Sequence, residues 1–191
     1  MTSHQRLWIA RHAQPLVAPG HCYGVLDMPA DTQATAQAAQ RLAHALPIRL
    51  RVWHSPLQRC AQLADALQMW RPDLHSQPDA RLQEMDFGAW EGRAWEHIAR
   101  ADIDLWVASF ATHRPGGGEH LQGMLMRVAA ALQQAHRTAR QEQSDILWLT
   151  HAGVARCVQW LLQAPAHTLP NADQWPIAAP ALGDWTHWPL D

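Results

Sequence analysis

The stretch LWIARHAQP, residues 7–15, is the starting point from which the fold of the chain can be inferred. Its first four residues are apolar, which is typical of a short buried strand. The apolar run stops at Arg11 and His12, just before Pro15. Ligands of α/β proteins bind beyond the carboxyl ends of the strands, so both side chains lie where a ligand is expected. A histidine after a strand can also be exposed or satisfied in the core, and the rest of the chain must supply its partners.

Length and charge limit the classes of partner. The chain has 191 residues, of which 48% are hydrophobic, and this fits a single domain over residues 1–191. Its 15 basic and 17 acidic residues give no electrostatic footprint for nucleic acid or a membrane surface. All of the basic residues except histidine are arginine, whose planar guanidinium suits phosphate and carboxylate. We expect a small-molecule partner, although genomic base composition also explains an arginine bias.

The cysteines and the N-terminal segment bear on the compartment. Cys22, Cys60 and Cys157 form no CxxC pair and leave one thiol unpaired under any disulfide scheme, which is typical of a reducing compartment. The first six residues lack the apolar stretch of a signal peptide, and no apolar segment is long enough to span a bilayer. We therefore expect a cytoplasmic protein. The oligomeric state stays open between a monomer and a homodimer.

A second strand is expected at residues 50–54, followed at once by the sequence SPLQR. Ser55 is a residue type that caps helices, Pro56 suits the first helical position, and Gln58 completes a capping box. Arg59 then lies in the first turn of a helix, where its guanidinium adds to the positive end of the helix dipole and favours an anion. An arginine on the helix surface is the alternative.

A third stretch, DILWLTHAGV at residues 145–154, repeats the design of the first: an apolar strand, then His151, then a turn of small residues into a helix. A last strand is expected within residues 178–190. Strands alternating with helices predict a three-layer α/β/α fold with a mostly parallel central sheet and helices on both faces. The carboxyl edge of that sheet would gather two guanidinium groups and two imidazoles: Arg11, Arg59, His12 and His151.

Carboxylates are concentrated in residues 79–91, DARLQEMDFGAWE, where Glu84, Asp86 and Glu91 stand among apolar residues. A carboxyl group with apolar neighbours has a raised pKa, as a general acid that works near neutral pH requires. Glu84 is the candidate proton donor. The alternative is that these acids cap the next helix or pair with arginines.

Two glycine-rich segments are expected to be loops. Residues 16–29 are rich in proline and glycine and are long enough to wrap a site. Residues 114–119, RPGGGE, precede a helix expected from Leu121 to about Arg140, and Glu119 suits its N-terminus. Because RPGGGE has neither the GxGxxG spacing nor a GK[ST] ending, we interpret it as a flexible loop or a mobile lid rather than a nucleotide loop.

Phosphoryl transfer needs charge stabilisation on the equatorial oxygens and an in-line nucleophile, and arginines and a histidine supply both without a metal. A zinc hydrolase is the competing hypothesis. The chain has no HExxH or paired HxH, and arginines beside a ligand histidine would oppose a cation. We expect neither a metal nor a cofactor.

In chain order these motifs resemble those of the histidine phosphatase superfamily, which has the phosphoglycerate mutase-like fold, over nearly the whole chain. Arg11-His12-Ala13-Gln14 is similar to the Arg-His-Gly-Glu signature of the family, and residues 55–59 are similar to its second arginine motif. Glu84 corresponds to the family's acid, and Thr150-His151-Ala152-Gly153 to its second histidine motif.

The resemblance implies a catalytic role for each of these residues. His12 becomes phosphorylated, and Arg11, Arg59 and His151 hold the phosphoryl group. Glu84 protonates the leaving alcohol, after which water hydrolyses the phosphohistidine. The resemblance therefore implies a metal-independent phosphatase of the histidine acid type.

Three residues depart from the family pattern. Ala13 replaces a glycine and Gln14 replaces a glutamate. If the glycine serves a positive φ or a close backbone approach, Ala13 strains the loop at a cost on the order of 1 kcal/mol, and we expect activity to survive. Val17 stands about where mutases carry an asparagine that touches phosphate, which favours hydrolysis over phosphoglycerate mutase activity. A phosphate-ester binding module that has lost catalysis is a further alternative.

Within the superfamily, residues 21–29, 84–92 and 115–119 look most like the α-ribazole-5′-phosphate phosphatases of cobalamin biosynthesis. This likeness implies a small phosphorylated metabolite, with α-ribazole 5′-phosphate as the candidate. It also assigns a substrate-binding role to Tyr23, Gly24 and Glu119. Scaffolds of this kind accept many phosphomonoesters, so the alcohol portion of the substrate stays open.

Overall fold

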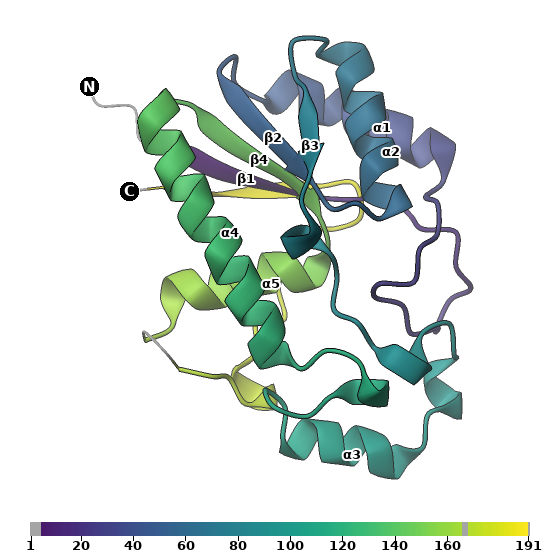
Figure 1. The fold of residues 1–191 in the computed structure, drawn as a ribbon. Helices are drawn as coiled ribbons and strands as arrows, with labels where there is room; N and C mark the ends of the chain where they lie inside the picture. Colours follow the sequence, from purple (N-terminus) through teal and green to yellow (C-terminus); the bar gives the residue numbers. More distant parts are fainter. Residues whose placement is uncertain (1–4, 166–167, 191) are drawn as a thin grey trace.

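A computed structural model describes residues 5–165 and 168–190 (Figure 1). A five-stranded sheet in the order β3-β2-β4-β1-β5 forms its centre. Its first four strands in the chain are parallel, and β5 pairs antiparallel with β1. The strands are β1 (Arg6–Arg11), β2 (Leu50–His54), β3 (Ser76–Pro78), β4 (Asp145–Thr150) and β5 (Trp185–Pro189).

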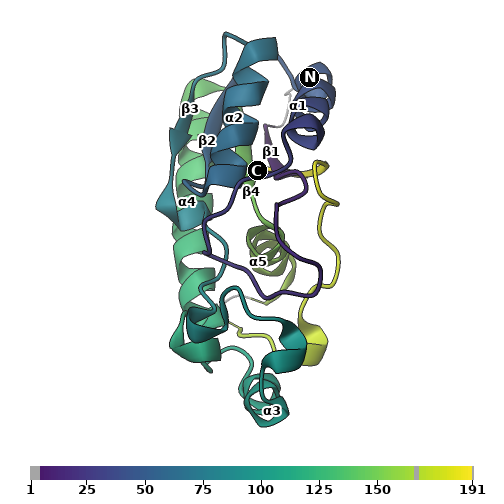
Figure 2. The ribbon, with the colours of Figure 1, turned by 90° about the vertical axis from the view of Figure 1, so that its right-hand side faces the viewer.

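Helices cover both faces of this sheet (Figure 1). One face carries α1 (Thr32–Ala45) and α2 (Gln58–Trp70), and the other carries α4 (Leu121–Glu142) and α5 (Ala152–Gln163). The remaining helix, α3 (Arg100–Ala108), lies at the end of the molecule remote from α1 and α2 (Figure 2). The predicted three-layer α/β/α fold is therefore confirmed. None of the helices within the described residues is long and apolar enough to cross a membrane.

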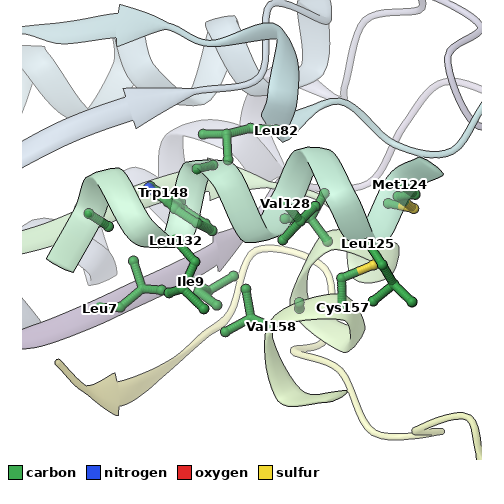
Figure 3. Packing of buried hydrophobic residues seen from close by; sticks show 14 of the residues in the cluster. Leu7, Ile9, Leu82, Met124, Leu125, Val128, Leu132, Trp148, Cys157 and Val158 are labelled. Atoms are coloured by element: carbon green, nitrogen blue, oxygen red, sulfur yellow. The ribbon is translucent and has the colours of Figure 1, made fainter. Parts of the chain in front are cut away.

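The opening apolar stretch forms a strand that is buried on both faces. Leu7 and Ile9 of β1 pack against α4 and α5, where Val128 and Leu132 of α4 meet them (Figure 3). Trp8 and Ala10 point the other way and belong to the cluster under α1 and α2. A parallel strand covered on both sides needs apolar residues at every position, so residues 7–10 show no polar alternation.

The pairing register places the chemistry of the chain. Arg11 at the end of β1 pairs with Thr150 at the end of β4. The next residues, His12 and His151, are consequently neighbours at the carboxyl edge of the sheet. The backbone N–H of His12 donates to the carbonyl of Thr150 at 3.1 Å, which extends the ladder up to the histidine itself.

The start of α2 differs from the prediction. The helix begins at Gln58, and its N-cap residue, Leu57, has no capping side chain. The cap comes from the long loop, because the carboxylate of Asp27 accepts from the backbone N–H of Gln58 at 2.7 Å and from its side-chain amide at 3.1 Å. The predicted capping box is thus wrong, and an anion that suits the helix dipole replaces it. Arg59 still lies in the first turn.

The glycines of residues 114–119 have a packing role. A Cβ on Gly116 would lie 2.1 Å from the carbonyl oxygen of Phe87, and one on Gly118 would lie 2.2 Å from that of Asp86. The backbone N–H of Glu119 also donates to the Asp86 carbonyl at 2.8 Å. Only glycine allows two backbones to approach this closely. The loop is therefore packed against the segment that follows Glu84.

Candidate active site

The two predicted histidines and Arg59 form one buried cluster at the sheet edge. The imidazole rings of His12 and His151 meet edge to face, with their centroids 5.1 Å apart. Arg59 reaches them from α2, and its Nε donates to Nε2 of His12 at 3.3 Å. These three side chains are buried, with 0 to 2% of their surface exposed.

The contacts of His12 determine which nitrogen carries the proton. Nδ1 lies 2.7 Å from the carbonyl oxygen of Ala13, and a carbonyl can only accept, so Nδ1 is the protonated nitrogen. Nε2 is then unprotonated, and its lone pair accepts from Nε of Arg59. Burial, followed by the charge of Arg59, lowers the pKa of His12 to about 3 against the opposing effect of the Ala13 hydrogen bond. The imidazole is neutral at pH 7, as a nucleophile must be.

His151 lies beneath His12 and is neutral for the same reason. Burial, followed by the electrostatic effects of the adjacent His12 imidazole and of Arg59, holds its pKa well below the ordinary value. Its Nε2 lies 2.8 Å from the hydroxyl oxygen of Ser55. The residue predicted to cap α2 therefore orients the second histidine.

Within residues 5–165 and 168–190, Arg59 and Arg11 carry positive charge without a carboxylate partner. Arg59 donates to the carbonyl oxygens of Gly24 and Leu26, the latter at 3.0 Å. Arg11 donates from Nη1 to the carbonyl of Pro180 at 3.2 Å, and its buried Nε has no acceptor among the described residues. Within that part of the chain neither guanidinium forms an ion pair. Two unpaired cations beside a neutral imidazole create a site suited to an anion.

Glu84 lies across the site at the start of α5. One of its carboxylate oxygens accepts from the backbone N–H of Gly153 at 2.9 Å, and the other accepts from the N–H of Met85 at 3.0 Å. A Cβ on Gly153 would lie only 2.0 Å from Oε1 of Glu84. Glycine at the end of the second histidine motif is thus required for this close approach.

A cavity of about 360 Å³ opens onto these groups. Its polar or charged lining consists of Arg11, His12, His21, Glu84 and Arg156. Its aromatic lining, which we call the aromatic wall, consists of Tyr23, Phe87, Trp95, Trp106, Phe110 and Trp175. The cavity therefore combines an edge suited to an anion with a lining suited to apolar, flat groups.

Most of the predicted site residues are brought together. Arg11, His12, Glu84 and Tyr23 line the cavity. Arg59 and His151 contact His12 and do not line the cavity. Gly24 contributes its carbonyl to Arg59.

Glu119 is not brought to this cavity. It forms an ion pair with Arg127, with 2.8 Å between Oε1 and Nε, and lines a separate hollow near Asp86. Sequence reasoning predicted Tyr23 but missed the rest of the aromatic wall. Its signal was present in the clustering of Phe87, Trp95, Trp106 and Phe110 within a short stretch of the chain.

The strain expected at Ala13 is not found. Gln143 is the only residue other than glycine with a positive φ among the described residues, so Ala13 does not need the left-handed region. Its methyl group is buried and packs in the same cluster as Trp8 and Ala10. The neighbouring Gln14 is exposed, and its amide donates to the carbonyl of Pro15 at 3.3 Å. Neither departure from the family pattern touches the cavity.

Within residues 5–165 and 168–190, no group of three or more His, Cys, Asp or Glu side chains is arranged so that it could hold a metal ion. The groups that meet at the cavity are instead guanidinium, imidazole and a single carboxylate.

The chain is similar to known proteins in sequence and in fold. The bifunctional 6-phosphofructo-2-kinase/fructose-2,6-bisphosphatase of Caenorhabditis elegans is 30% identical over 128 residues, which cover 65% of this chain and 26% of that protein. The chain thus spans about a quarter of this relative's length. Among solved structures, the TTHB049 protein of Thermus thermophilus is 26% identical with a TM-score of 0.71, covering 96% of this chain and 92% of that one.

A mycobacterial glucosyl-3-phosphoglycerate phosphatase is 23% identical with a TM-score of 0.76, over 97% of this chain and 90% of that one, which shows the shared fold. The profile of the histidine phosphatase superfamily (branch 1) matches residues 7–180, from the first strand to the carbonyl that holds Arg11. The chain belongs to the histidine phosphatase superfamily, branch 1.

Proposed function

We propose that this chain is a phosphomonoesterase that hydrolyses a small phosphate ester through a phosphohistidine at His12, without a metal. The observation that carries the proposal is the state of Nε2 of His12. It is an unprotonated nitrogen beside the guanidinium of Arg59, in a histidine that lines the cavity together with Arg11. A neutral nucleophile beside unpaired cations is what transfer of a phosphoryl dianion requires.

In the first step of this mechanism, the lone pair of Nε2 forms a bond to phosphorus and the bond from phosphorus to the leaving oxygen breaks. A proton on Glu84 passes to that oxygen, so the alcohol leaves neutral. The hydrogen bond from Nδ1 to the Ala13 carbonyl stabilises the positive charge on the ring. As Nε2 attacks, it gives up the hydrogen bond that Nε of Arg59 donates to it in the free enzyme, and that N–H turns to an oxygen of the transferred group.

In the second step, water attacks the phosphorus and the bond to Nε2 breaks. The carboxylate of Glu84 takes the proton that water loses, so acid and base roles return to their starting state. The products are inorganic phosphate and the free enzyme.

For the substrate we propose α-ribazole 5′-phosphate, which would place the enzyme in cobalamin biosynthesis. The aromatic wall, to which Trp95, Trp106 and Phe110 belong, supports a heteroaromatic leaving portion, because flat rings stack on indole and phenyl faces. Val17 has no side-chain group that hydrogen-bonds a phosphate, which supports hydrolysis over mutase activity.

A panel of phosphomonoesters tests this function. Wild-type protein and the His12→Ala variant are assayed for phosphate release from α-ribazole 5′-phosphate, fructose 2,6-bisphosphate, glucosyl-3-phosphoglycerate and p-nitrophenyl phosphate. We expect the highest kcat/KM for α-ribazole 5′-phosphate and loss of all turnover in His12→Ala. Preference for a sugar phosphate would reject the proposed substrate alone. Interconversion of phosphoglycerates with little phosphate release would indicate a mutase, and binding without turnover would indicate a binding module.

A further inference from the structure

The carboxylate of Glu91 is surrounded by backbone N–H groups rather than by cations. It accepts from the N–H groups of Gly24 at 2.8 Å, Val25 at 3.1 Å, Leu26 at 3.1 Å and Phe87 at 2.9 Å. Three of the four donors are consecutive residues of the loop after β1. We call residues 24–26 the strap.

We call the group formed by Arg11, His12 and Arg59 the phosphate pocket. The strap lies between Glu91 and this pocket. Its N–H groups are directed at Glu91, while its carbonyl oxygens at Gly24 and Leu26 accept from the two terminal nitrogens of Arg59. The remaining nitrogen of Arg59, Nε, donates to Nε2 of His12 at 3.3 Å. An unbroken series of hydrogen bonds therefore runs from Glu91 through the strap and Arg59 to the proposed nucleophile.

Close packing around Gly24 restricts the position of the strap. A Cβ on Gly24 would lie 1.8 Å from the carbonyl oxygen of Met85 and 2.9 Å from Oε1 of Glu91. The residues beside the strap do not depend on Glu91, because Cys22 exchanges backbone hydrogen bonds of 2.8 Å with Arg93 and Gly92. Apart from the N–H of Phe87 in its own segment, Glu91 therefore acts on residues 24–26.

We propose that Glu91 is a positioning residue for the phosphate pocket, which holds Arg59 against His12 by fixing the strap. The proposal rests on the function proposed above. An anion that accepts from the strap N–H groups polarises the same peptide chain and makes its carbonyls better acceptors for the guanidinium. Without the Glu91 carboxylate, the three N–H groups of the strap lose their acceptor. The strap carbonyls then no longer fix the position of Arg59.

The variant Glu91→Gln tests this role, with Asp86→Asn as its matched control. Asp86 lies in the same segment and also accepts a backbone N–H, from Gly88 at 2.7 Å, but within the described residues it forms no hydrogen bond with the strap. We expect Glu91→Gln to raise both the KM for p-nitrophenyl phosphate and the inhibition constant of inorganic phosphate about tenfold, since the negative charge is lost and a donor NH₂ group replaces one of the two accepting oxygens. Asp86→Asn should change both constants by less than about twofold.

Combination with Arg59→Lys separates positioning from general damage. If Glu91 acts through Arg59, Glu91→Gln adds no further weakening of phosphate inhibition when Arg59 is already lysine. An equal weakening in both backgrounds, or unchanged phosphate inhibition in a folded Glu91→Gln variant, overturns the proposal. Should that variant fail to fold, Glu91→Asp is measured in its place, because it keeps the charge and withdraws the carboxylate by one methylene.

Failure of the proposed function gives a different result. In that case the wild type itself releases no phosphate from any ester, while calorimetric titration with inorganic phosphate still compares wild type, Glu91→Gln and Asp86→Asn. Equal phosphate affinity in all three then overturns the positioning role as well.

Discussion

At the scale of single residues, the burial of neutral histidines has a consequence for stability. Burial lowers the pKa of His12 to about 3 and holds that of His151 well below its ordinary value, with nearby guanidinium charge adding to the effect. In the unfolded chain both regain a pKa near 6.5. Between pH 6.5 and about 3 the unfolded state consequently binds more protons than the folded state. By linkage, the free energy of unfolding rises with pH in this window and levels off above it.

We therefore expect the free energy of unfolding to fall as pH is lowered from 7 to 5, with a slope that approaches about 1.4 kcal/mol per pH unit for each histidine. His54, whose pKa is also lowered by burial, contributes with the same sign. Denaturant titrations across this range measure the slope. It should be smaller in His12→Gln than in the wild type. A stability that is constant or rises on acidification would contradict the buried neutral state.

At the scale of secondary-structure elements, the approach of Glu84 to the start of α5 depends on Gly153. A Cβ at that position would lie 2.0 Å from the carboxylate, so the side chain must move. In the first turn of a helix, alanine is otherwise preferred over glycine by roughly 0.5–1 kcal/mol, so folding should not suffer. Gly153→Ala thus displaces the proposed acid without unfolding the protein.

The expected result of Gly153→Ala is a loss that depends on the leaving group. The kcat/KM for an alkyl phosphate should fall by about 100-fold, because general acid catalysis contributes on this order. The kcat/KM for p-nitrophenyl phosphate should fall far less, because p-nitrophenolate leaves without a proton. Glu84→Gln should show the same selectivity. Gly123→Ala is the matched control, as Gly123 occupies the first turn of α4, where a Cβ would meet the side chain of His120. Equal losses on both esters would reject Glu84 as the acid.

The elements also show what the sequence could predict. The register of β1 on β4 follows from two apolar runs that both end in histidine, so the pairing of His12 with His151 could be predicted. The cap of α2 could not, because its acceptor, Asp27, is about thirty residues away and meets Gln58 only after the loop has folded.

The same limit applies to the remaining carboxylates. Glu84, Glu91 and Glu119 are each consistent with an acid, a cap or an ion pair when only their neighbours in the sequence are known. Their roles are separated by long-range partners: Gly153 for Glu84, the strap for Glu91 and Arg127 for Glu119. These contacts join segments of the chain that no local pattern relates.

At the scale of the whole molecule, two parts of the structure line the cavity, and each supplies a different kind of side chain. The sheet edge supplies the arginines and the nucleophile, while the segment that carries α3, at the far end of the molecule in Figures 1 and 2, supplies Trp95 and Trp106. Phosphate chemistry and selection of the alcohol are therefore separable. Substitution in the aromatic wall should alter which ester is used and leave the bond to His12 as the common intermediate.

That intermediate is the central claim, and one measurement tests it most directly. Wild-type protein is mixed with an ester carrying a labelled phosphoryl group, denatured within milliseconds, and divided between acid and alkaline treatment before the modified peptide is identified. The account predicts a label on His12 that is stable to alkali and lost in acid, absent from His12→Ala and retained in Glu84→Gln. Turnover of the ester by the wild type with no label on the protein, or a label that persists in His12→Ala, would contradict it.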